Sequence, residues 1–315
     1  MAQASTPNSA VIETKALTKI YGPVKAVEDL SLSVSRGGVF GLLGPNGSGK
    51  TTTMGMLLGL VRPSSGSFHI FGHQGATPSV LRKVGAIIET PSFYPYLSGR
   101  DNLRFFQGLS GKGSPDEIES LLKKVDLSAR AKSKFSTFSL GMKQRLGIAY
   151  ALLGDPELVF LDEPTNGLDP AGVAEVRDLI VDLGTGGRTV VLSSHILHEV
   201  EMVCESVAIL SKGRLIAKGR VKDLLAHKEA VQLKTTDDNS ALKVLSSITW
   251  IESAAFEDGQ LIVKAPLTRS WELSKALAGA GIYINRLTPV TVSLEEYFLG
   301  VTSDEKPADS KDQGK

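Results

Sequence analysis

The chain contains the run Gly44-Pro45-Asn46-Gly47-Ser48-Gly49-Lys50-Thr51, which matches the pattern G-x-x-x-x-G-K-[ST]. The run follows an apolar segment typical of a buried strand, residues 39–43, and precedes a helix-compatible segment, residues 50–60. Glycines allow the backbone to curl until successive N–H groups point inward, and the following helix adds the positive end of its dipole. This stretch therefore predicts a binding site for phosphate groups.

The last two residues of the run carry the side-chain chemistry of such a site. Lys50 would reach the β- and γ-phosphates of a nucleotide, and the Thr51 hydroxyl would ligate Mg²⁺. The alternative is a chance match, which a random chain of this length and composition contains about 2% of the time. The strand before the run and the helix after it favour a nucleotide-binding loop.

A second buried strand, residues 158–161, ends in Asp162-Glu163-Pro164. A helical pattern at residues 172–183 and a third apolar strand at residues 189–193 follow, which predicts a βαβ unit in a parallel sheet. The carboxyl edge of such a sheet binds ligands. There Asp162 would hold Mg²⁺ through water, and Glu163 would act as a general base toward the attacking water. The alternative is a solvated strand end, because Asp and Glu commonly flank strands.

The composition excludes several classes of protein. The 315 residues include 35 basic and 34 acidic side chains, so the formal charge of +1 offers no overall attraction for a polyanion, and we expect no nucleic-acid partner. The single cysteine, Cys204, excludes an internal disulfide framework and a cysteine-based zinc site. The most apolar stretches, such as residues 54–61, are far shorter than the ~20 residues that span a bilayer. We therefore expect a soluble chain with a large core.

The pattern of elements changes along the chain. Residues 98–153 are predicted to be mainly helical, and residues 207–211 and 214–218 to form a hairpin that turns at Lys212-Gly213. After about Arg220 the order βαββαβ predicts a ferredoxin-like arrangement with a turn at Asp258-Gly259. The polar tail, residues 303–315, is predicted to be disordered.

Several further motifs follow one another in order. They are Tyr21, Phe138-Ser139-Leu140-Gly141-Met142-Lys143-Gln144-Arg145, the strand ending in Asp162-Glu163-Pro164, Asn166-Gly167-Leu168-Asp169 and Ser194-His195. Over roughly residues 10–220 this series closely resembles the nucleotide-binding subunit of ABC (ATP-binding cassette) transporters. The resemblance implies an α/β fold, namely a P-loop NTPase cassette with a helical subdomain, and ATP and Mg²⁺ as cofactors.

The resemblance also implies how the chain is organised. Residues 1–222 would form the ATP-binding domain, with the helical subdomain at about 92–153. Residues 223–302 would form a small C-terminal α+β (ferredoxin-like) domain with an accessory or regulatory role.

Roles at the chain's own nucleotide follow from the same resemblance. Tyr21 would stack on adenine, although a tyrosine before a glycine is often only a turn residue. The glycine loop, which ends at Thr51 and Thr52, would be the Walker A motif, and Asp162 and Glu163 would end the Walker B motif. His195 would be the switch histidine near the γ-phosphate, although a lone histidine after a strand is more often structural. Lys50, Glu163 and His195 would then carry catalysis.

Other roles reach across a dimer interface. Ser139 and Gly141 occupy the signature positions that would contact the γ-phosphate of ATP held by the opposite subunit, and Asp169 would be the D-loop aspartate. The resemblance therefore implies a head-to-tail dimer of two copies with two ATP molecules between them. Ser139 is also predicted to be the N-cap of a helix that runs from Met142 onward.

Two motifs depart from the common pattern of the family. The signature usually reads Leu-Ser-Gly-Gly-Gln, whereas Phe138-Ser139-Leu140-Gly141-Met142 keeps only the serine and the second glycine. After residues 84–88 the family usually has Gln, whereas this chain has Glu89. A carboxylate can still ligate Mg²⁺ or orient water, but it adds negative charge near the phosphates. Glutamate at this position resembles the branch typified by bacitracin-resistance exporters.

A transporter subunit of this kind requires an integral membrane permease as partner. The aromatic residues Phe93, Tyr94, Tyr96, Phe105 and Phe106 lie where the family receives the permease, and the alternative is that they pack the core of the helical subdomain. The run Leu294-Glu295-Glu296-Tyr297-Phe298 resembles the tail of ATPase subunits from ABC-2-type exporters of drugs, antibiotics or polysaccharides.

The sequence therefore predicts an ATPase subunit, peripheral on the cytoplasmic face of the membrane, that powers export through a separate permease. A soluble ABC ATPase of translation or DNA repair is the alternative. It is disfavoured because the chain has one uninterrupted cassette and a neutral charge. A P-loop GTPase is disfavoured because the sequence has no Asn-Lys-x-Asp motif.

Overall fold

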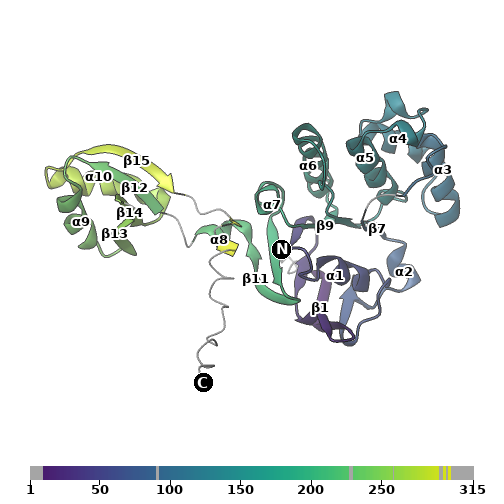
Figure 1. Cartoon of the computed structure of the whole chain (residues 1–315), viewed down its shortest axis with the longest axis horizontal. Helices are drawn as coiled ribbons and strands as arrows, with labels where there is room; N and C mark the ends of the chain where they lie inside the picture. Colours follow the sequence, from purple (N-terminus) through teal and green to yellow (C-terminus); the bar gives the residue numbers. More distant parts are fainter. Residues whose placement is uncertain are drawn as a thin grey trace, which may run out of the picture. The chain divides into compact units, whose positions relative to one another are not determined.

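The chain consists of two units that divide between Gly219 and Arg220. The computed structural model describes residues 10–89, 92–226, 230–257, 259–290, 294–295 and 297–298 (Figure 1). The expected tail at residues 303–315 lies outside these residues, and so do Asp258 of the expected turn and Glu296 of the C-terminal run.

A six-stranded sheet in the first unit has the order β11-β10-β4-β9-β8-β7. Its strands are β4 (Gly38–Leu43), β7 (Val84–Ile87), β8 (Leu158–Asp162), β9 (Thr189–Ser194), β10 (Ser206–Ser211) and β11 (Arg214–Arg220). The pairs from β10 through β4, β9 and β8 to β7 are all parallel, which confirms the parallel sheet expected from the βαβ unit. All residues of β8 and β9 are buried, as is typical of strands covered on both faces.

The parallel order brings four loops to one edge of this sheet. β4 leads into the glycine loop and α1 (Lys50–Leu57), β7 leads toward Glu89, β8 leads into Glu163, and β9 leads into His195. Helix α6 (Pro170–Thr185) connects β8 to β9 and packs on β4 and β9, and α7 (Leu197–Val203) follows β9. Because parallel strands all end on the same side, the segments with the candidate side chains meet at the carboxyl edge.

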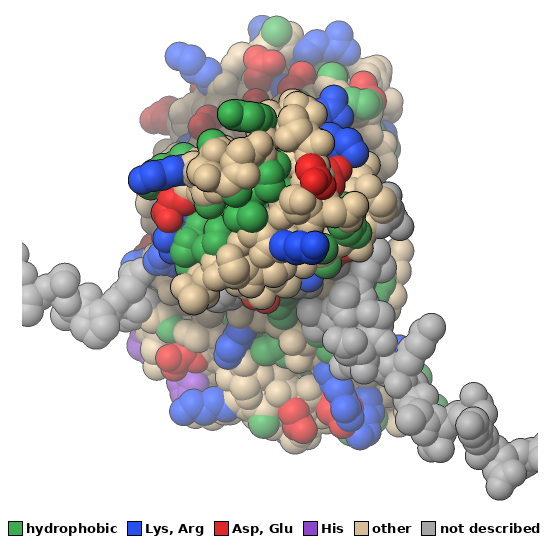
Figure 2. All heavy atoms as spheres, turned by 90° about the vertical axis from the view of Figure 1, so that its left-hand side faces the viewer, with side chains coloured by type: hydrophobic (Ala, Val, Ile, Leu, Met, Phe, Trp, Pro, Cys, Tyr) green, Lys and Arg blue, Asp and Glu red, His purple; other side chains and the backbone are tan. Residues whose placement is uncertain are grey.

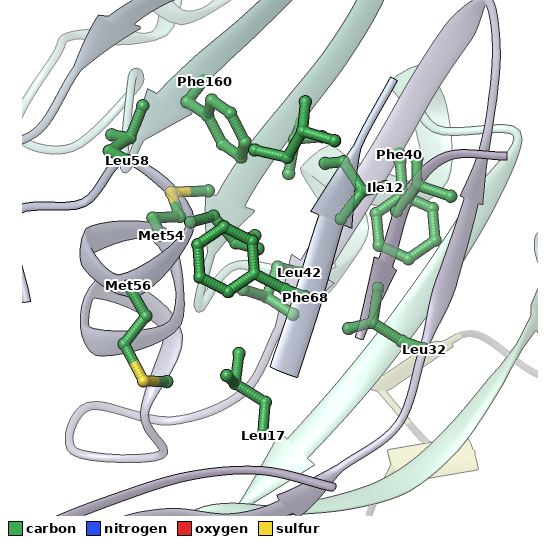
Figure 3. Packing of buried hydrophobic residues seen from close by; sticks show 14 of the residues in the cluster. Ile12, Leu17, Leu32, Phe40, Leu42, Met54, Met56, Leu58, Phe68 and Phe160 are labelled. Atoms are coloured by element: carbon green, nitrogen blue, oxygen red, sulfur yellow. The ribbon is translucent and has the colours of Figure 1, made fainter. Parts of the chain in front are cut away.

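An antiparallel sheet completes the core of the first unit. Its order is β2-β1-β5-β6, with β3 paired to β1. The strands are β1 (Ala10–Tyr21), β2 (Val24–Leu30), β3 (Ser33–Ser35), β5 (Ser65–Ile70) and β6 (His73–Gln74). Phe68 of β5, Met54 of α1 and Phe160 of β8 lie in one buried cluster, so this sheet, the first helix and the parallel sheet share a core (Figure 3).

The segment between β7 and β8 is mainly helical, as predicted. It contains α3 (Gly99–Ser110), α4 (Glu117–Lys124) and α5 (Leu140–Ala151), which pack on one another, and the 3₁₀ turns Ser128–Arg130 and Phe135–Thr137. Ser98 is the N-cap residue of helix α3, and its hydroxyl accepts a hydrogen bond from the Asp101 N–H (3.1 Å). No helix in the described ranges is both long and apolar enough to cross a membrane.

The second unit has the expected ferredoxin-like order. Its elements are α8 (Val221–Ala226), β12 (Ala230–Thr235), α9 (Asp238–Ser246), β13 (Ser253–Glu257), β14 (Gln260–Lys264), the 3₁₀ turn Leu267–Arg269, α10 (Ser270–Gly279) and β15 (Ile284–Val290). The antiparallel sheet has the order β13-β14-β12-β15. Its core joins Val231 and Leu261 of the sheet to Leu245 and Leu277 of the two helices. Hydrophobic side chains also reach the surface of this unit (Figure 2).

Some elements differ from the sequence-based expectation. The expected helix at residues 50–60 ends at Leu57, because Gly59 has a φ of 74° and the Leu60 N–H turns back to the Gly55 carbonyl (2.9 Å). Neither β2 nor α7 was predicted, and neither was the short helix α2 (Pro78–Leu81). Strand β2 buries Val27 and Leu30, three residues apart, and its pairing with β1 is irregular, so its sequence does not alternate.

The shared core predicts a large stability loss when Phe160 is truncated. Its side chain is fully buried, so Phe160→Ala would leave a cavity and lower the free energy of unfolding by about 3–5 kcal/mol. Urea denaturation followed by circular dichroism measures this change. Leu60→Ala, at a position that is 70% exposed, serves as the control and should change the free energy by less than about 0.5 kcal/mol. Equal losses in both variants would contradict the assignment of Phe160 to the core.

Candidate functional site

The glycine loop adopts a conformation that requires glycine. Gly49 precedes α1 with a φ of 102°, and a Cβ atom built on it would lie 2.4 Å from the Ala26 carbonyl oxygen. A Cβ atom on Gly44 would lie 2.2 Å from the Leu210 carbonyl oxygen. The backbones of β2 and β10 therefore pack closely against the loop. Glycine is needed in the loop for two reasons, because it adopts a positive φ and because it leaves room for these neighbouring backbones.

The turn between β10 and β11 supports the same loop. The Gly213 N–H donates to the Ser48 carbonyl (3.1 Å), and the Gly213 carbonyl accepts from the Glu28 N–H (2.8 Å). The sequence identified Gly213 only as a turn glycine, and nothing local to it could indicate this longer-range contact. Inside the loop, the Ser48 hydroxyl is buried and has no hydrogen-bond partner among the residues that the structure describes. A buried hydroxyl of this kind fits a loop that binds the oxygens of a phosphate group.

The Lys50 side chain folds back onto the glycine loop and binds its backbone carbonyls. Its side chain is only 5% exposed, and its ammonium donates to the carbonyls of Gly44 (2.7 Å) and Pro45 (3.3 Å). Its Nζ also lies 3.3 Å from Oε1 of Glu163. The structure therefore brings the predicted lysine and the second predicted carboxylate into direct contact.

Asp162 lies between two hydroxyl groups at the end of β8. Its Oδ2 accepts a hydrogen bond from the Thr51 hydroxyl of α1 (2.8 Å), and its Oδ1 accepts one from the Ser193 hydroxyl of β9 (2.5 Å). The Asp162 carboxylate is buried. A carboxylate beside a hydroxyl is the kind of oxygen pair that suits Mg²⁺, so Thr51 and Asp162 fit the predicted metal site.

Glu163 lies between Lys50 and His195. Its Oε2 is 2.7 Å from Nδ1 of His195, while its Oε1 faces Lys50. Its backbone has a φ of 48°, in the left-handed region, which costs a non-glycine residue roughly 1–2 kcal/mol. Its N–H donates to the Ser193 hydroxyl (2.9 Å). Of the three residues predicted as catalytic, Glu163 therefore contacts both Lys50 and His195.

Ser193 is a functional candidate that sequence reasoning missed. It is one of three buried polar residues of β9, with Thr189 and Ser194, and its partners become evident only from the register in which it lies opposite Asp162.

A second group of predicted residues forms a separate groove. Ser139 caps α5 by accepting from the Met142 N–H (3.2 Å), which confirms the predicted N-cap, although the helix begins at Leu140 rather than Met142. Asp169 caps α6 by accepting from the Gly172 N–H (3.0 Å). Ser139, Gly141 and Asp169 line one groove of about 440 Å³. Among the described residues that line it, none belongs to the glycine loop.

Tyr21, Thr52 and Glu89 occupy three different places. Tyr21 ends β1 with 47% of its surface exposed, and Nζ of Lys19 lies 4.8 Å from the centre of its ring. Thr52 lies in the first turn of α1 and is half-buried. Glu89 is exposed, with a φ of 61°. In the described part of the chain, no three His, Cys, Asp or Glu side chains form a group that could hold a metal, so Glu89 does not join Asp162 and Glu163 in one.

Glu89 instead lines a groove beside the helical segment, together with Phe93, Phe106 and Tyr150. An adjoining groove contains Lys112, whose ammonium donates to the carbonyls of Leu81 (2.8 Å) and Val84 (2.7 Å). Burial lowers the pKa of Lys112. Residues of β7 and of the helical segment line both grooves.

The predicted aromatic residues divide into two groups. Phe93 packs edge-on against the rings of Phe106 (5.5 Å between centroids) and Phe135 (5.2 Å), inside the helical segment. The rings of Tyr94 and Phe105 contact each other (4.9 Å) but remain partly exposed, and Tyr96 is 65% exposed. The core-packing alternative therefore describes Phe93 and Phe106, and the exposed rings are available for contact.

Comparison with known proteins gives consistent results. The profile of the family described as ABC transporter matches residues 27–166. The bacitracin transport ATP-binding protein BcrA of Bacillus licheniformis is 40% identical, over 92% of this chain and 97% of that protein. The lantibiotic transport ATP-binding protein SrtF of Streptococcus pyogenes is 42% identical, over 65% of this chain and 89% of that protein. A solved ATP-binding subunit of an ABC transporter is 34% identical, with a TM-score of 0.61, over 68% of this chain and 91% of that one.

The close packing around the glycine loop predicts unequal effects of alanine at two of its glycines. Gly47 and Gly49 both have positive φ, but a Cβ atom on Gly47 would meet nothing within 4 Å. Gly47→Ala should therefore lower the free energy of unfolding by about 1 kcal/mol from backbone strain alone. Gly49→Ala should cost more, because it also clashes with the Ala26 carbonyl. Urea denaturation midpoints of the two variants test this, and an equal loss would contradict the packing argument.

Proposed function

Because this chain belongs to the ABC transporter family of ATP-binding proteins, we propose that it is the ATPase subunit that powers export of a drug or antibiotic through a separate membrane permease. The observation that carries the proposal is the position of Glu163. Its carboxylate lies at the carboxyl edge of the sheet, in contact with both Lys50 and His195 and beside the phosphate-binding loop.

In this proposal the glycine loop binds the phosphates of ATP. The N–H groups at the start of α1 and the Ser48 hydroxyl would donate to phosphate oxygens, and Lys50 would exchange its present acceptors for the β- and γ-phosphates. The exposed ring of Tyr21 would stack on adenine, and Thr52 would contact the phosphates from α1. Thr51 and Asp162 would hold Mg²⁺. Glu89 does not group with Asp162 and Glu163 in this structure, so it would have to move toward them on nucleotide binding to act as a further ligand. The ion would neutralise charge on the phosphates.

The hydrolytic step would use Glu163 as the general base. Once Lys50 has turned to the phosphates, the Glu163 carboxylate is available to accept a proton from the attacking water. His195, 2.7 Å from the same carboxylate, would orient that group and stabilise the charge that develops on the γ-phosphate.

The groove that contains Ser139, Gly141 and Asp169 supports the proposal of a head-to-tail dimer. These residues lie at the N-termini of α5 and α6, which favour anions, yet they line a groove without the glycine loop. In a dimer each groove would contact the ATP held by the other copy. ATP binding would then close the dimer and hydrolysis would reopen it, which shifts the permease between conformations.

The permease would dock beside the helical segment. The exposed rings of Tyr94, Tyr96 and Phe105 offer an apolar surface there, and a groove lined by Glu89 lies beside the same segment. A chain bound to a permease in this way would lie at the cytoplasmic face of the membrane. The small second unit would regulate the dimer or stabilise it.

The printed names of two relatives support the proposed substrate class. BcrA is described as a bacitracin transport protein and SrtF as a lantibiotic transport protein. An ABC ATPase of translation or repair, the second candidate, would not copurify with a permease. Coexpression with candidate permeases, followed by affinity purification of this chain, therefore distinguishes the two functions.

The proposal predicts that Glu163→Gln still binds ATP but accumulates as a closed dimer. Loss of the base should lower the rate of ATP hydrolysis about 100-fold or more. Phosphate release measures hydrolysis, and size-exclusion chromatography with ATP and Mg²⁺ measures the dimer. Glu157→Gln, which changes a glutamate at the opposite end of β8 that pairs with Arg36 and Lys83, should hydrolyse normally. A Glu163→Gln variant with the wild-type rate would show that the base is misassigned.

Lys50→Ala is predicted to weaken nucleotide binding. Lys50 offers charged hydrogen bonds at the loop, so its loss should lower ATP affinity about 10- to 100-fold. Titration with a fluorescent ATP analogue measures the affinity. Lys83→Ala, at an exposed lysine, should leave it unchanged. Unchanged affinity in Lys50→Ala would remove the argument that this loop holds the phosphates.

A further inference from the structure

Ser193 links the two adjacent carboxylate residues at the end of β8. It is completely buried, and β9 pairs with β8 so that Ser193 lies opposite Asp162. Its hydroxyl donates to Oδ1 of Asp162 (2.5 Å) and accepts from the backbone N–H of Glu163 (2.9 Å). One hydroxyl group therefore contacts a side chain and a backbone group from consecutive residues.

The direction of each hydrogen bond is determined by the chemistry of the groups. A backbone N–H can only donate, so the Ser193 oxygen accepts from Glu163. A serine hydroxyl has a single proton, which is then left for the Asp162 carboxylate. With Oδ1 occupied in this way, Oδ2 is the oxygen that faces the Thr51 hydroxyl. Ser193 therefore determines which way the Asp162 carboxylate is turned.

The hydrogen bond between Ser193 and the Glu163 N–H stabilises the backbone conformation of Glu163. Glu163 leaves the strand with a φ of 48°, a conformation that a non-glycine residue keeps only when its surroundings hold it. Because Glu163 lies beyond the end of β8, its N–H does not pair within the sheet and instead donates to the Ser193 hydroxyl oxygen. The same backbone conformation directs the Glu163 side chain toward Lys50 and His195.

We propose that Ser193 is a positioning residue for ATP hydrolysis, which sets the orientation of the Asp162 carboxylate and the backbone of Glu163 together. This inference rests on the proposed function, in which Asp162 holds the metal ion and Glu163 is the base. Ser193 touches neither nucleotide nor water in this role. It couples the two carboxylates, so that a change at one strand end affects both metal binding and the chemical step.

The test uses Ser193→Ala in the full chain, with three measurements. Partners of this kind contribute about 10- to 100-fold to metal affinity or activity. We therefore expect kcat to fall about 10- to 100-fold while the KM for ATP changes less than about 3-fold. Electron paramagnetic resonance of Mn²⁺, titrated with a nonhydrolysable ATP analogue present, should show weaker metal binding. Nucleotide affinity in EDTA should match wild type, because the glycine loop is unchanged.

Thr189→Val is the matched control. Thr189 is a buried residue at the other end of the same strand, and its hydroxyl accepts from the Gly37 N–H (2.8 Å). This variant also removes a buried hydroxyl from β9, so it shows what that loss alone does to kcat and to Mn²⁺ binding. Its kcat and its Mn²⁺ affinity should remain at the wild-type values.

Two outcomes would overturn the inference. One is a Ser193→Ala variant with the wild-type kcat and Mn²⁺ affinity. The other is a loss of nucleotide affinity in EDTA in parallel with kcat, because that would indicate general damage to the fold. Glu163→Gln assayed in parallel separates this inference from the proposed function. If Glu163→Gln is inactive and Ser193→Ala is normal, only the role of Ser193 fails, whereas an active Glu163→Gln variant contradicts the proposed function itself.

Discussion

The register of three parallel strands is the constraint on which the candidate site depends. Asp162 pairs with Ser193 across β8 and β9, and Leu43 pairs with Ser194 across β4 and β9. These strands therefore end at the same level, and the glycine loop, the two carboxylates and His195 leave the sheet close to one another. A shift of one residue in β8 would turn the Asp162 side chain to the opposite face of the sheet, away from Thr51.

The fold was predictable where the sequence carried a strong local pattern. The apolar strands β4, β8 and β9 and the helix between β8 and β9 identified the parallel sheet, and the βαββαβ order identified the second unit. Strand β2 was missed because its buried residues do not alternate and its pairing with β1 is irregular. Helix α7 was missed because it is short and buries only Val200, so its sequence has little periodicity.

The candidate site was predictable where a residue's type and its position at a strand end coincide. Asp162 and Glu163 were identified in this way, Lys50 and Thr51 through the glycine pattern between a strand and a helix, and His195 through the order of motifs along the chain. The contacts of Ser193 and Gly213 were not predictable, because each depends on a neighbouring strand or turn that is distant in sequence. The sequence also could not show that Phe93 packs inside the helical segment whereas Tyr94 stays partly exposed, because this depends on which face of the segment is covered.

The contacts of Lys50 have a consequence for nucleotide exchange. An ammonium group has three N–H bonds, and Lys50 has three acceptors within reach, the carbonyls of Gly44 and Pro45 and the Glu163 carboxylate. Lys50 therefore holds the two loop carbonyls in place and balances the negative charge of Glu163. The loop is preorganised in this way before a ligand binds. When nucleotide binds or product leaves, the Lys50 ammonium group then only exchanges one set of hydrogen-bond acceptors for another. No flexible segment has to be ordered, so that entropic cost is avoided.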